Sequence, residues 1–360
     1  MKLAFFDDYP LERGHHPDYL LGMAAAARGP LFCPDSFLDN RPKASGFGHY
    51  PVVGAPDGAP SVTRANLEFS CERAAGDGCD VVVNAFIDEN WDAFPVDRRG
   101  LRFLQCLHRP GELPGTLGGV NETKPGDAVA TIRMLGETDL VVVHTATGEQ
   151  QARQWLPPER VVRLGWPAAT VDAVRERFAR PISAAAGEPY VLLVGEALEY
   201  KGIHVLLRAL ADGPLLRIAG NLAIGDCCWL SAVHPGVRAS WEPGWTSRAR
   251  MEELLVGASV VVFPYVAGFA AHGGVSAALV HALTFASRIV VSAELAPQLP
   301  LCATCTVVPT GDAEALRAAI DVALAKPPTH PAGSAALLAE LEREHTYEGH
   351  VTGLIERLAW

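Results

Sequence analysis

One turn of this sequence places a lysine where it could hold an anion. The apolar run YVLLV ends at Gly195, a polar turn with Glu196 follows, and Lys201 and Gly202 directly precede the helical pattern IHVLLRAL. A lysine at this point can bring its ammonium to the anion that a helix N-terminus favours. The pattern therefore predicts a phosphate-binding turn, and a solvated helix cap is the alternative that it leaves open.

A second turn is rich in glycine. The run SVVVFPY leads through small residues to His272, Gly273 and Gly274, and Val275 and Ser276 then open the nearly apolar run AALVHALTFA. A helix without polar residues is expected to be buried, and glycines before its first amides let a phosphate approach the backbone. Close packing of the helix on a strand also selects glycine, so both explanations stay open at this stage.

Histidines follow two predicted strands of the first half. His15 and His16 precede a helical pattern, and His108 and Arg109 end the strand pattern LRFLQCLH. A histidine beside an arginine at the carboxyl end of a strand suits proton transfer or contact with a phosphate. An ion pair between arginine and glutamate in the loop is the open alternative.

The elements that must position these residues alternate regularly. In the first half, short apolar strands separate helical stretches such as residues 17–27 and 65–75, and the alternation restarts at YVLLV. Strand and helix patterns in alternation predict parallel sheets, and ligands of such sheets bind at the carboxyl ends of the strands. The segment 41–63, rich in glycine and proline, is expected to be a long loop.

The length and a break in composition predict two domains. A chain of 360 residues exceeds what one core supports, and small residues, glycine and proline at 181–189 suggest a linker. We expect a first Rossmann-like domain over 1–180, completed by a C-terminal helix over 345–360, and a second over 188–340. The predicted class is α/β, with two doubly wound domains.

The charge and the cysteines exclude several functions. A net charge of −11 gives no long-range attraction for nucleic acid or anionic lipid. No apolar run reaches the ~20 residues of a membrane span, and the start lacks the pattern of a signal peptide, so we expect a cytoplasmic protein without an integral membrane segment. Cys302 and Cys305 form a CxxC pair without a second pair, so no metal site and no cofactor are predicted.

The second half resembles a known family. The order of Gly195, Lys201-Gly202, LLRAL and LLRIAG, then Gly244-Trp245 and MEELLVGASVVVFPY, is similar to the donor domain of the retaining GT-B glycosyltransferases of family 4. The first half matches only through a Gly14-His15 turn and the strand-end His108.

This resemblance implies two Rossmann-like domains that face across a cleft, with a nucleoside-diphosphate sugar on the second and an acceptor on the first. It implies donor binding by one set of residues, namely Gly195, Glu196, Lys201, Gly202, Gly244, Trp245, His272, Gly273, Gly274, Val275, Ser276 and His281. It implies acceptor binding by Gly14 and His15, and it places His16 and His108 at the transferred sugar. Together with Arg109, which the strand-end pattern adds, His16 and His108 are the predicted catalytic residues.

The sequence departs from the family at the donor site. Glu196 stands where the family has an arginine, and Gly273 and His281 stand where it has two glutamates. The family also includes members with a Pro-Tyr turn, and Pro264 and Tyr265 are closest to those. Ribose and sugar recognition would then fall to His272 and His281.

These patterns predict a glycosyltransferase that moves a sugar from a nucleoside-diphosphate sugar to a glycan or small molecule. Because no Asp-x-Asp motif is present, we expect metal-independent transfer, and retention of configuration follows from the resemblance alone. A non-catalytic GT-B binding protein or partner subunit and a nucleotide-sugar epimerase are the alternatives.

Overall fold

In a computed structural model of the 360-residue chain, two compact units emerge from the packing. The first comprises Met1–Thr170, Ala271–Val275 and Arg343–Trp360, and the second Val171–Ala270 and Ser276–Glu342. The structure describes residues 1–8, 16–38, 47–55, 59–85, 97–108, 110, 135–180, 188–195, 198–220, 236–242, 244, 246–286, 288–300, 305–325 and 335–359.

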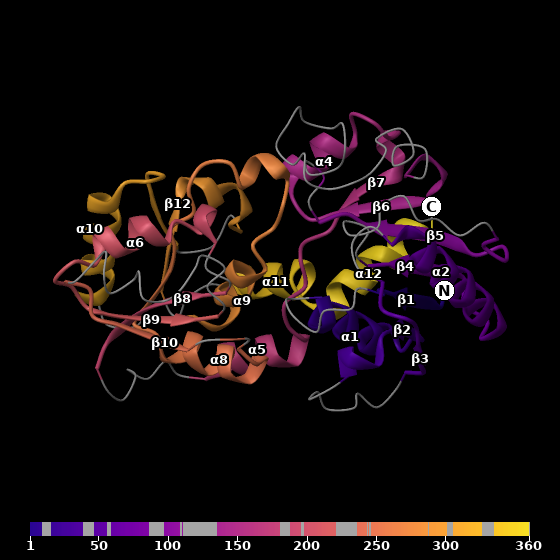
Figure 1. The fold of residues 1–360 in the computed structure, drawn as a ribbon, viewed down its shortest axis with the longest axis horizontal. Coiled ribbons are helices and arrows are strands. Elements are labelled where there is room, and N and C mark those ends of the chain that lie inside the picture. Colours follow the sequence, from indigo (N-terminus) through magenta and orange to yellow (C-terminus); the bar gives the residue numbers. More distant parts are fainter. Residues whose placement is uncertain are drawn as a thin grey trace. The chain divides into compact units, whose positions relative to one another are not determined.

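The first unit is built on a seven-stranded parallel sheet with the order β3-β2-β1-β4-β5-β6-β7 (Figure 1). Its strands are β1 (Leu3–Phe6), β2 (Leu31–Cys33), β3 (His49–Pro51), β4 (Val81–Asn84), β5 (Arg102–Cys106), β6 (Leu140–Val143) and β7 (Val161–Arg163). The central strands are apolar and buried along their length because helices cover both faces of such a sheet. The helices are α1 (His16–Ala27), α2 (Pro60–Gly76), α4 (Ala146–Ala152) and α12 (Tyr347–Leu358).

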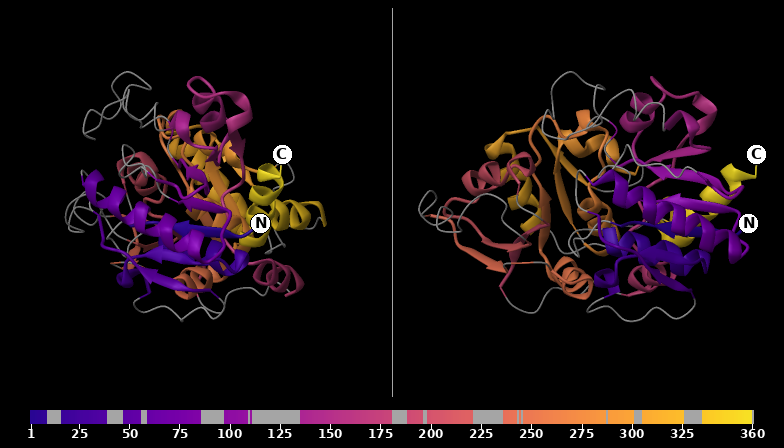
Figure 2. Two further views of the ribbon diagram at one scale, coloured as in Figure 1. Left: turned by 90° about the vertical axis from the view of Figure 1, so that its right-hand side faces the viewer. Right: turned by 45° about the vertical axis from the view of Figure 1, so that its right-hand side comes forward.

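The C-terminal helix α12 packs against α1 within this unit. Figure 2 shows its yellow ribbon beside the indigo N-terminal elements. Gly22 of α1 makes the contact possible, since a Cβ there would lie 2.3 Å from the ring of Tyr347. Val351, Leu354 and Leu358 supply the buried face of α12.

The second unit is built on a six-stranded parallel sheet with the order β10-β9-β8-β11-β12-β13. Its strands are β8 (Tyr190–Val194), β9 (Leu215–Ala219), β10 (Ala239–Glu242), β11 (Val260–Phe263), β12 (Ile289–Ser292) and β13 (Thr306–Val308). Its helices are α5 (Val171–Ala179), α6 (Ile203–Ala209), α8 (Arg248–Gly257), α9 (Ala277–Phe285), α10 (Ala313–Ala325) and α11 (Ala335–Glu344), the last of which ends in the first unit.

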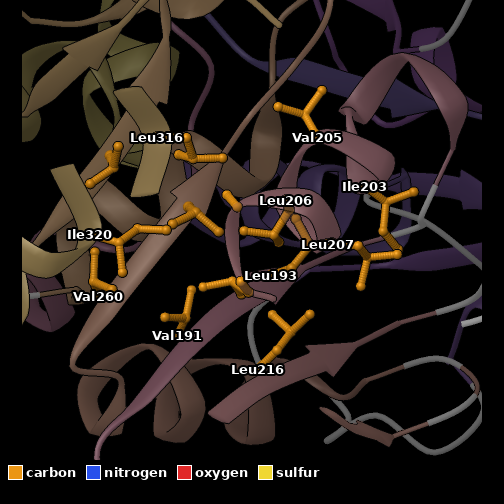
Figure 3. Packing of buried hydrophobic residues seen from close by; sticks show 14 of the residues in the cluster. Val191, Leu193, Ile203, Val205, Leu206, Leu207, Leu216, Val260, Leu316 and Ile320 are labelled. Carbon is orange, nitrogen blue, oxygen red and sulfur yellow. The ribbon is translucent and has the colours of Figure 1, made fainter. Parts of the chain in front are cut away.

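A core of branched aliphatic side chains joins this sheet to two of its helices. Leu206 of α6 and Leu316 and Ile320 of α10 meet Val191 and Val260 of the strands beneath them (Figure 3). All five are almost completely buried. Dense packing of this kind fixes the strand ends, and with them the turns that the sequence singled out.

Two expectations about the elements need correction. The segment 41–63 was expected to be an irregular loop, but its described part holds the edge strand β3, and α2 begins at Pro60. The sequence gives no strand signal for β3, because the strand has only three residues and lies at the edge of the sheet. The predicted linker at 181–189 lies largely outside the described residues.

The first unit ends at Thr170, ten residues before the expected boundary. Helix α5 belongs to the second unit because Arg177, although buried, donates from Nε to the carbonyl of Phe285 at the end of α9. Arg175 of the same helix pairs with Glu342 of α11. These contacts are long-range in sequence, so the composition break at 181–189 gives no sign of them.

Candidate functional site

The strand ends of the second unit bring two backbone segments unusually close together. Gly195 follows β8 with φ 97°, and Gly220 follows β9 with φ 136°. A Cβ on Gly220 would lie 2.3 Å from the carbonyl oxygen of Gly195. Both positions therefore require glycine, and the carboxyl end of this sheet is lined by main chain.

Lys201 ends the short 3₁₀ helix η4 (Glu199–Lys201) beside this glycine pair. Its Nζ lies 3.2 Å from the point that a Cβ on Gly195 would occupy, and the Cβ of Ala278 in α9 lies 3.9 Å from the same point. The turn into α6 depends on Gly202, which has φ 70° and leaves no room for a Cβ beside the carbonyl of Pro264. The lysine ammonium and the first turn of α9 thus both lie near Gly195.

Helix α9 has a well-defined start at this place. Ser276 is its N-cap, and the Ser276 hydroxyl accepts a hydrogen bond from the amide of Leu279 at 3.3 Å. The Tyr265 hydroxyl lies 3.1 Å from the same Oγ. The amides of Ala277 and Ala278 come before the first intrahelical hydrogen bonds and carry the positive end of the helix dipole.

Lys201 and the N-terminus of α9 thus lie at the same carboxyl end of the sheet, in a protein with a net charge of −11. A helix N-terminus and a lysine beside glycine turns are the groups that bind phosphate in open parallel sheets. The chemistry available there is stabilisation of the charge that develops on a diphosphate leaving group.

The glycine pair that precedes α9 belongs to a segment that packs within the first unit. Residues 271–275 pack within the first unit, where the Thr145 hydroxyl donates to the carbonyl of Gly273 at 2.6 Å. Gly273 has φ 70°, and a Cβ there would lie 2.8 Å from the Cα of Gly148 in α4. Close packing, the alternative that the sequence left open, accounts for this glycine, although the partner is α4. Donor binding by His272, Gly273, Gly274 and Val275 stays a prediction.

His281 lies in the second turn of α9 and stacks on Phe285, with ring centroids 6.1 Å apart. Burial, and to a lesser extent Arg248, lower the pKa of His281 to about 3. Its Nε2 is buried and has no hydrogen-bond partner among the described residues. The ring is therefore neutral, and its predicted contact with the donor remains untested.

For two other predicted site residues, Gly244 and His16, the structure gives the backbone position. Gly244 has φ 92° and no atom near the position of a Cβ, so its backbone angle alone requires glycine. His16 is the first residue of α1. The remaining predictions, which concern Gly14, His15, Arg109, Glu196 and Trp245, lie outside the described residues.

His108 lies in a buried cluster in the first unit. Its Nε2 lies 2.6 Å from the carbonyl oxygen of Ala85, and its ring stacks on His144 at 4.8 Å. Trp166 and Tyr19 contact both imidazoles edge-on or nearly so. These are the contacts of a core residue, and a catalytic role for His108 stays a prediction.

The same cluster contains His350 of α12, whose ring is fully buried. Its Nδ1 lies 2.8 Å from the carbonyl oxygen of Gly165, and its Nε2 lies 3.2 Å from the hydroxyl of Tyr19. If Nδ1 carries the proton, both contacts are hydrogen bonds of a neutral ring. Burial lowers the pKa of His350 to about 4.

Sequence reasoning missed the buried aspartates that follow β1. Asp8 accepts a hydrogen bond from Asn66 Nδ2 at 2.8 Å. Burial, with a smaller contribution from Asp7, raises the pKa of Asp8 to about 7 against the lowering effect of Asn66. Two adjacent aspartates at a strand's carboxyl end were the available signal, but burial could not be read from the sequence.

The described residues contain no group of three potential metal ligands and no helix long and apolar enough to cross a membrane. No family model matches the chain, and no curated protein matches it in sequence.

Solved structures match the chain along nearly its whole length. Anabaena HepE in complex with UDP shares 12% identity over 100% of both chains with a TM-score of 0.67. Sucrose-phosphate synthase from Thermosynechococcus elongatus shares 17% over 99% of this chain and 98% of its own, with a TM-score of 0.66. A glycosyltransferase from Rickettsia africae shares 12% over 98% and 96%, with a TM-score of 0.68.

The chain has the GT-B fold. The two parallel sheets with flanking helices are the Rossmann-like halves that the sequence predicted. At these identities the likeness concerns the fold, and activity has to be argued from the site.

Proposed function

We propose that this GT-B protein is a glycosyltransferase that uses a nucleoside-diphosphate sugar. The observation that supports the proposal is the carboxyl end of β8, where Lys201 Nζ and the Cβ of Ala278 in α9 lie 3.2 Å and 3.9 Å from the point that a Cβ on Gly195 would occupy. Solved structures of the same fold include Anabaena HepE bound to UDP and to UDP-glucose, which makes uridine nucleotides the first donors to test.

In this proposal the site acts on the leaving group. Breaking the bond between the sugar and the diphosphate builds negative charge on the diphosphate oxygens. The Lys201 ammonium and the amides of Ala277 and Ala278 are preorganised to receive that charge, so stabilisation is stronger in the transition state than in the bound donor. Transfer without a metal and with retention of configuration are parts of the proposal, as is the identity of the acceptor as a glycan or small molecule.

Calorimetry with UDP, GDP and ADP tests the binding step. We expect one of them to bind, and Lys201→Ala to weaken that binding about tenfold or more, because a charge-assisted contact is worth roughly 1.5–3 kcal/mol. Arg208→Ala is the matched control, since it removes a cation from the exposed face of α6 in the same unit and should leave the affinity unchanged. If the Lys201 variant and the wild type bind the nucleotide with equal affinity, Lys201 does not contact the diphosphate and the proposal fails.

Mass spectrometry of a donor panel tests the chemistry. A transferase releases nucleoside diphosphate in the presence of an acceptor, or slowly by hydrolysis. An epimerase returns an isomeric nucleotide sugar instead. Binding without either product favours a non-catalytic role, which is the alternative suggested by Glu196, Gly273 and His281 in place of the expected arginine and glutamates.

A further inference from the structure

The 3₁₀ helix η6 (Ala293–Gln298), which follows β12, presents side-chain oxygens to backbone amides of a neighbouring turn. Glu294 Oε1 accepts hydrogen bonds from the amide of Gly268 at 3.1 Å and from the amide of Ala270 at 2.7 Å. One turn later, Gln298 Oε1 accepts from the amide of Ser276, the N-cap of α9, at 2.9 Å. Two residues of η6 thus hold three amides around the α9 start.

The turn that Glu294 holds is exposed and bends at a glycine. Gly268 has φ 114°, and no atom lies within 4 Å of the position of a Cβ, so the backbone angle and not packing requires glycine there. Ala267 and Gly268 are exposed. An exposed turn with open space around its glycine has little side-chain packing to order it, so its hydrogen bonds to neighbouring groups decide how rigid it is.

The same turn is bound on its other side to the element that carries Lys201. The amide of Val266 donates to the carbonyl of Tyr200 at 2.8 Å. The rings of Tyr200 and Phe269 stack at 5.3 Å with an angle of 11° between their planes. Movement of the 266–270 turn would therefore displace Tyr200 and, through it, Lys201.

We propose that Glu294 is a positioning residue for the diphosphate of the donor. By holding the amides of Gly268 and Ala270, it fixes the turn against which η4 packs and so keeps the Lys201 ammonium beside α9. Gln298 fixes the N-cap of that helix in the same way. The inference rests on the proposed function for its ligand and on the hydrogen bonds of η6 for its structure.

Amide hydrogen exchange in the ligand-free protein tests the structural half. In Glu294→Ala, the peptide covering 266–270 should exchange at least tenfold faster, because two charge-assisted hydrogen bonds are lost. Glu294→Gln keeps an acceptor oxygen and should restore most of the protection. Glu188→Ala, which removes a carboxylate that pairs with Arg238 in the same unit, is the control. Unchanged exchange in Glu294→Ala would overturn the inference whatever the protein binds.

Calorimetry with UDP and with inorganic pyrophosphate tests the ligand half. We expect Glu294→Ala to weaken both about tenfold and Glu294→Gln to stay within about threefold of the wild type, while thermal unfolding of the two variants remains similar. Faster exchange with unchanged affinity would overturn the positioning role. If the wild type binds neither probe, the proposed function fails, and the ligand half of the inference fails with it. The exchange result distinguishes that case from a failure of the Glu294 contacts.

Discussion

The two units share a parallel-sheet architecture but fill the carboxyl ends of their strands differently. In the first unit those ends are closed by large side chains, with His108, His144 and Trp166 packed around Tyr19. In the second they are lined by glycine main chain, at Gly195 and Gly220. Side chains in the first unit consolidate a core, whereas in the second the ends of β8 and β9 are main chain without side chains. The same architecture is therefore filled by side chains in one half, and in the other it carries the main-chain site that we propose for the donor.

The largest test of this contrast is Gly220→Ala. The new Cβ would meet the carbonyl oxygen of Gly195 at 2.3 Å and would sit at φ 136°, so we expect a loss of about 4 kcal/mol in the free energy of unfolding. Gly78→Ala in the first unit is the control, because its φ of 69° costs only about 1 kcal/mol and its surroundings are open. Denaturant unfolding that shows equal losses for the two variants would break the comparison.

In the first unit, the buried imidazole of His350 makes the stability of the packed side-chain cluster depend on pH. Its pKa in the folded state, about 4, lies below the ordinary value of 6.5, so the unfolded chain binds more protons between these values. The stability that the neutral ring provides is complete above pH 6.5 and is lost as the pH falls to 4, by about 3 kcal/mol. Asp8 acts in the opposite sense, because its raised pKa of about 7 costs stability as the pH rises from 3.8 to 7.

Urea unfolding of His350→Gln at pH 8, 6 and 4.5 isolates this effect. The variant should be less stable than the wild type at pH 8, and the difference should shrink as the pH falls. The Asp8 contribution cancels because it is common to both proteins. A difference that does not depend on pH would show that the pKa of His350 is the same in the folded and the unfolded chain, and would contradict the lowered value.

The two helix caps provide the smallest test. Ser276 caps α9 in the second unit and Thr346 caps α12 in the first, each by accepting an amide hydrogen bond. Alanine at either position should cost about 1 kcal/mol of stability. Only Ser276→Ala should also weaken UDP binding, by a few-fold, because only α9 directs its amides toward the proposed diphosphate. Equal UDP affinities for the two variants would contradict that division.

Much of the fold was predictable because its signals are local. Apolar runs such as VVVN at β4 and LVVV at β6 predict buried strands of a parallel sheet, and the structure confirms the two Rossmann-like halves. The short edge strand β3 and the position of α5 were missed, since a three-residue strand has no period and α5 is assigned by contacts of Arg177 and Arg175 with distant segments.

The candidate site was predictable only in part. The turn at Lys201 and Gly202 could be predicted because its pattern lies in consecutive residues. In the structure, Lys201 and the first turn of α9 both lie near Gly195. Glu294 could not be found in this way, because it reaches the amides of Gly268 and Ala270 from 24 or more residues away in the chain. The glycine at 273 was correctly singled out as unusual, but its nearest neighbours belong to α4.

The sequence by itself determined the longer buried strands and the helices that follow them, because periodicity, glycine and capping residues act over a few positions. It also determined the net charge of −11, which gives the protein no long-range attraction for an anion. Only the tertiary structure decided which groups each predicted site residue contacts. Gly195 and Gly220 are adjacent because β8 and β9 pair, and Lys201 meets α9 because β8 lies beside β11. Pairing of strands that are distant in the chain depends on the packing of the whole sheet, so short-range patterns do not determine it.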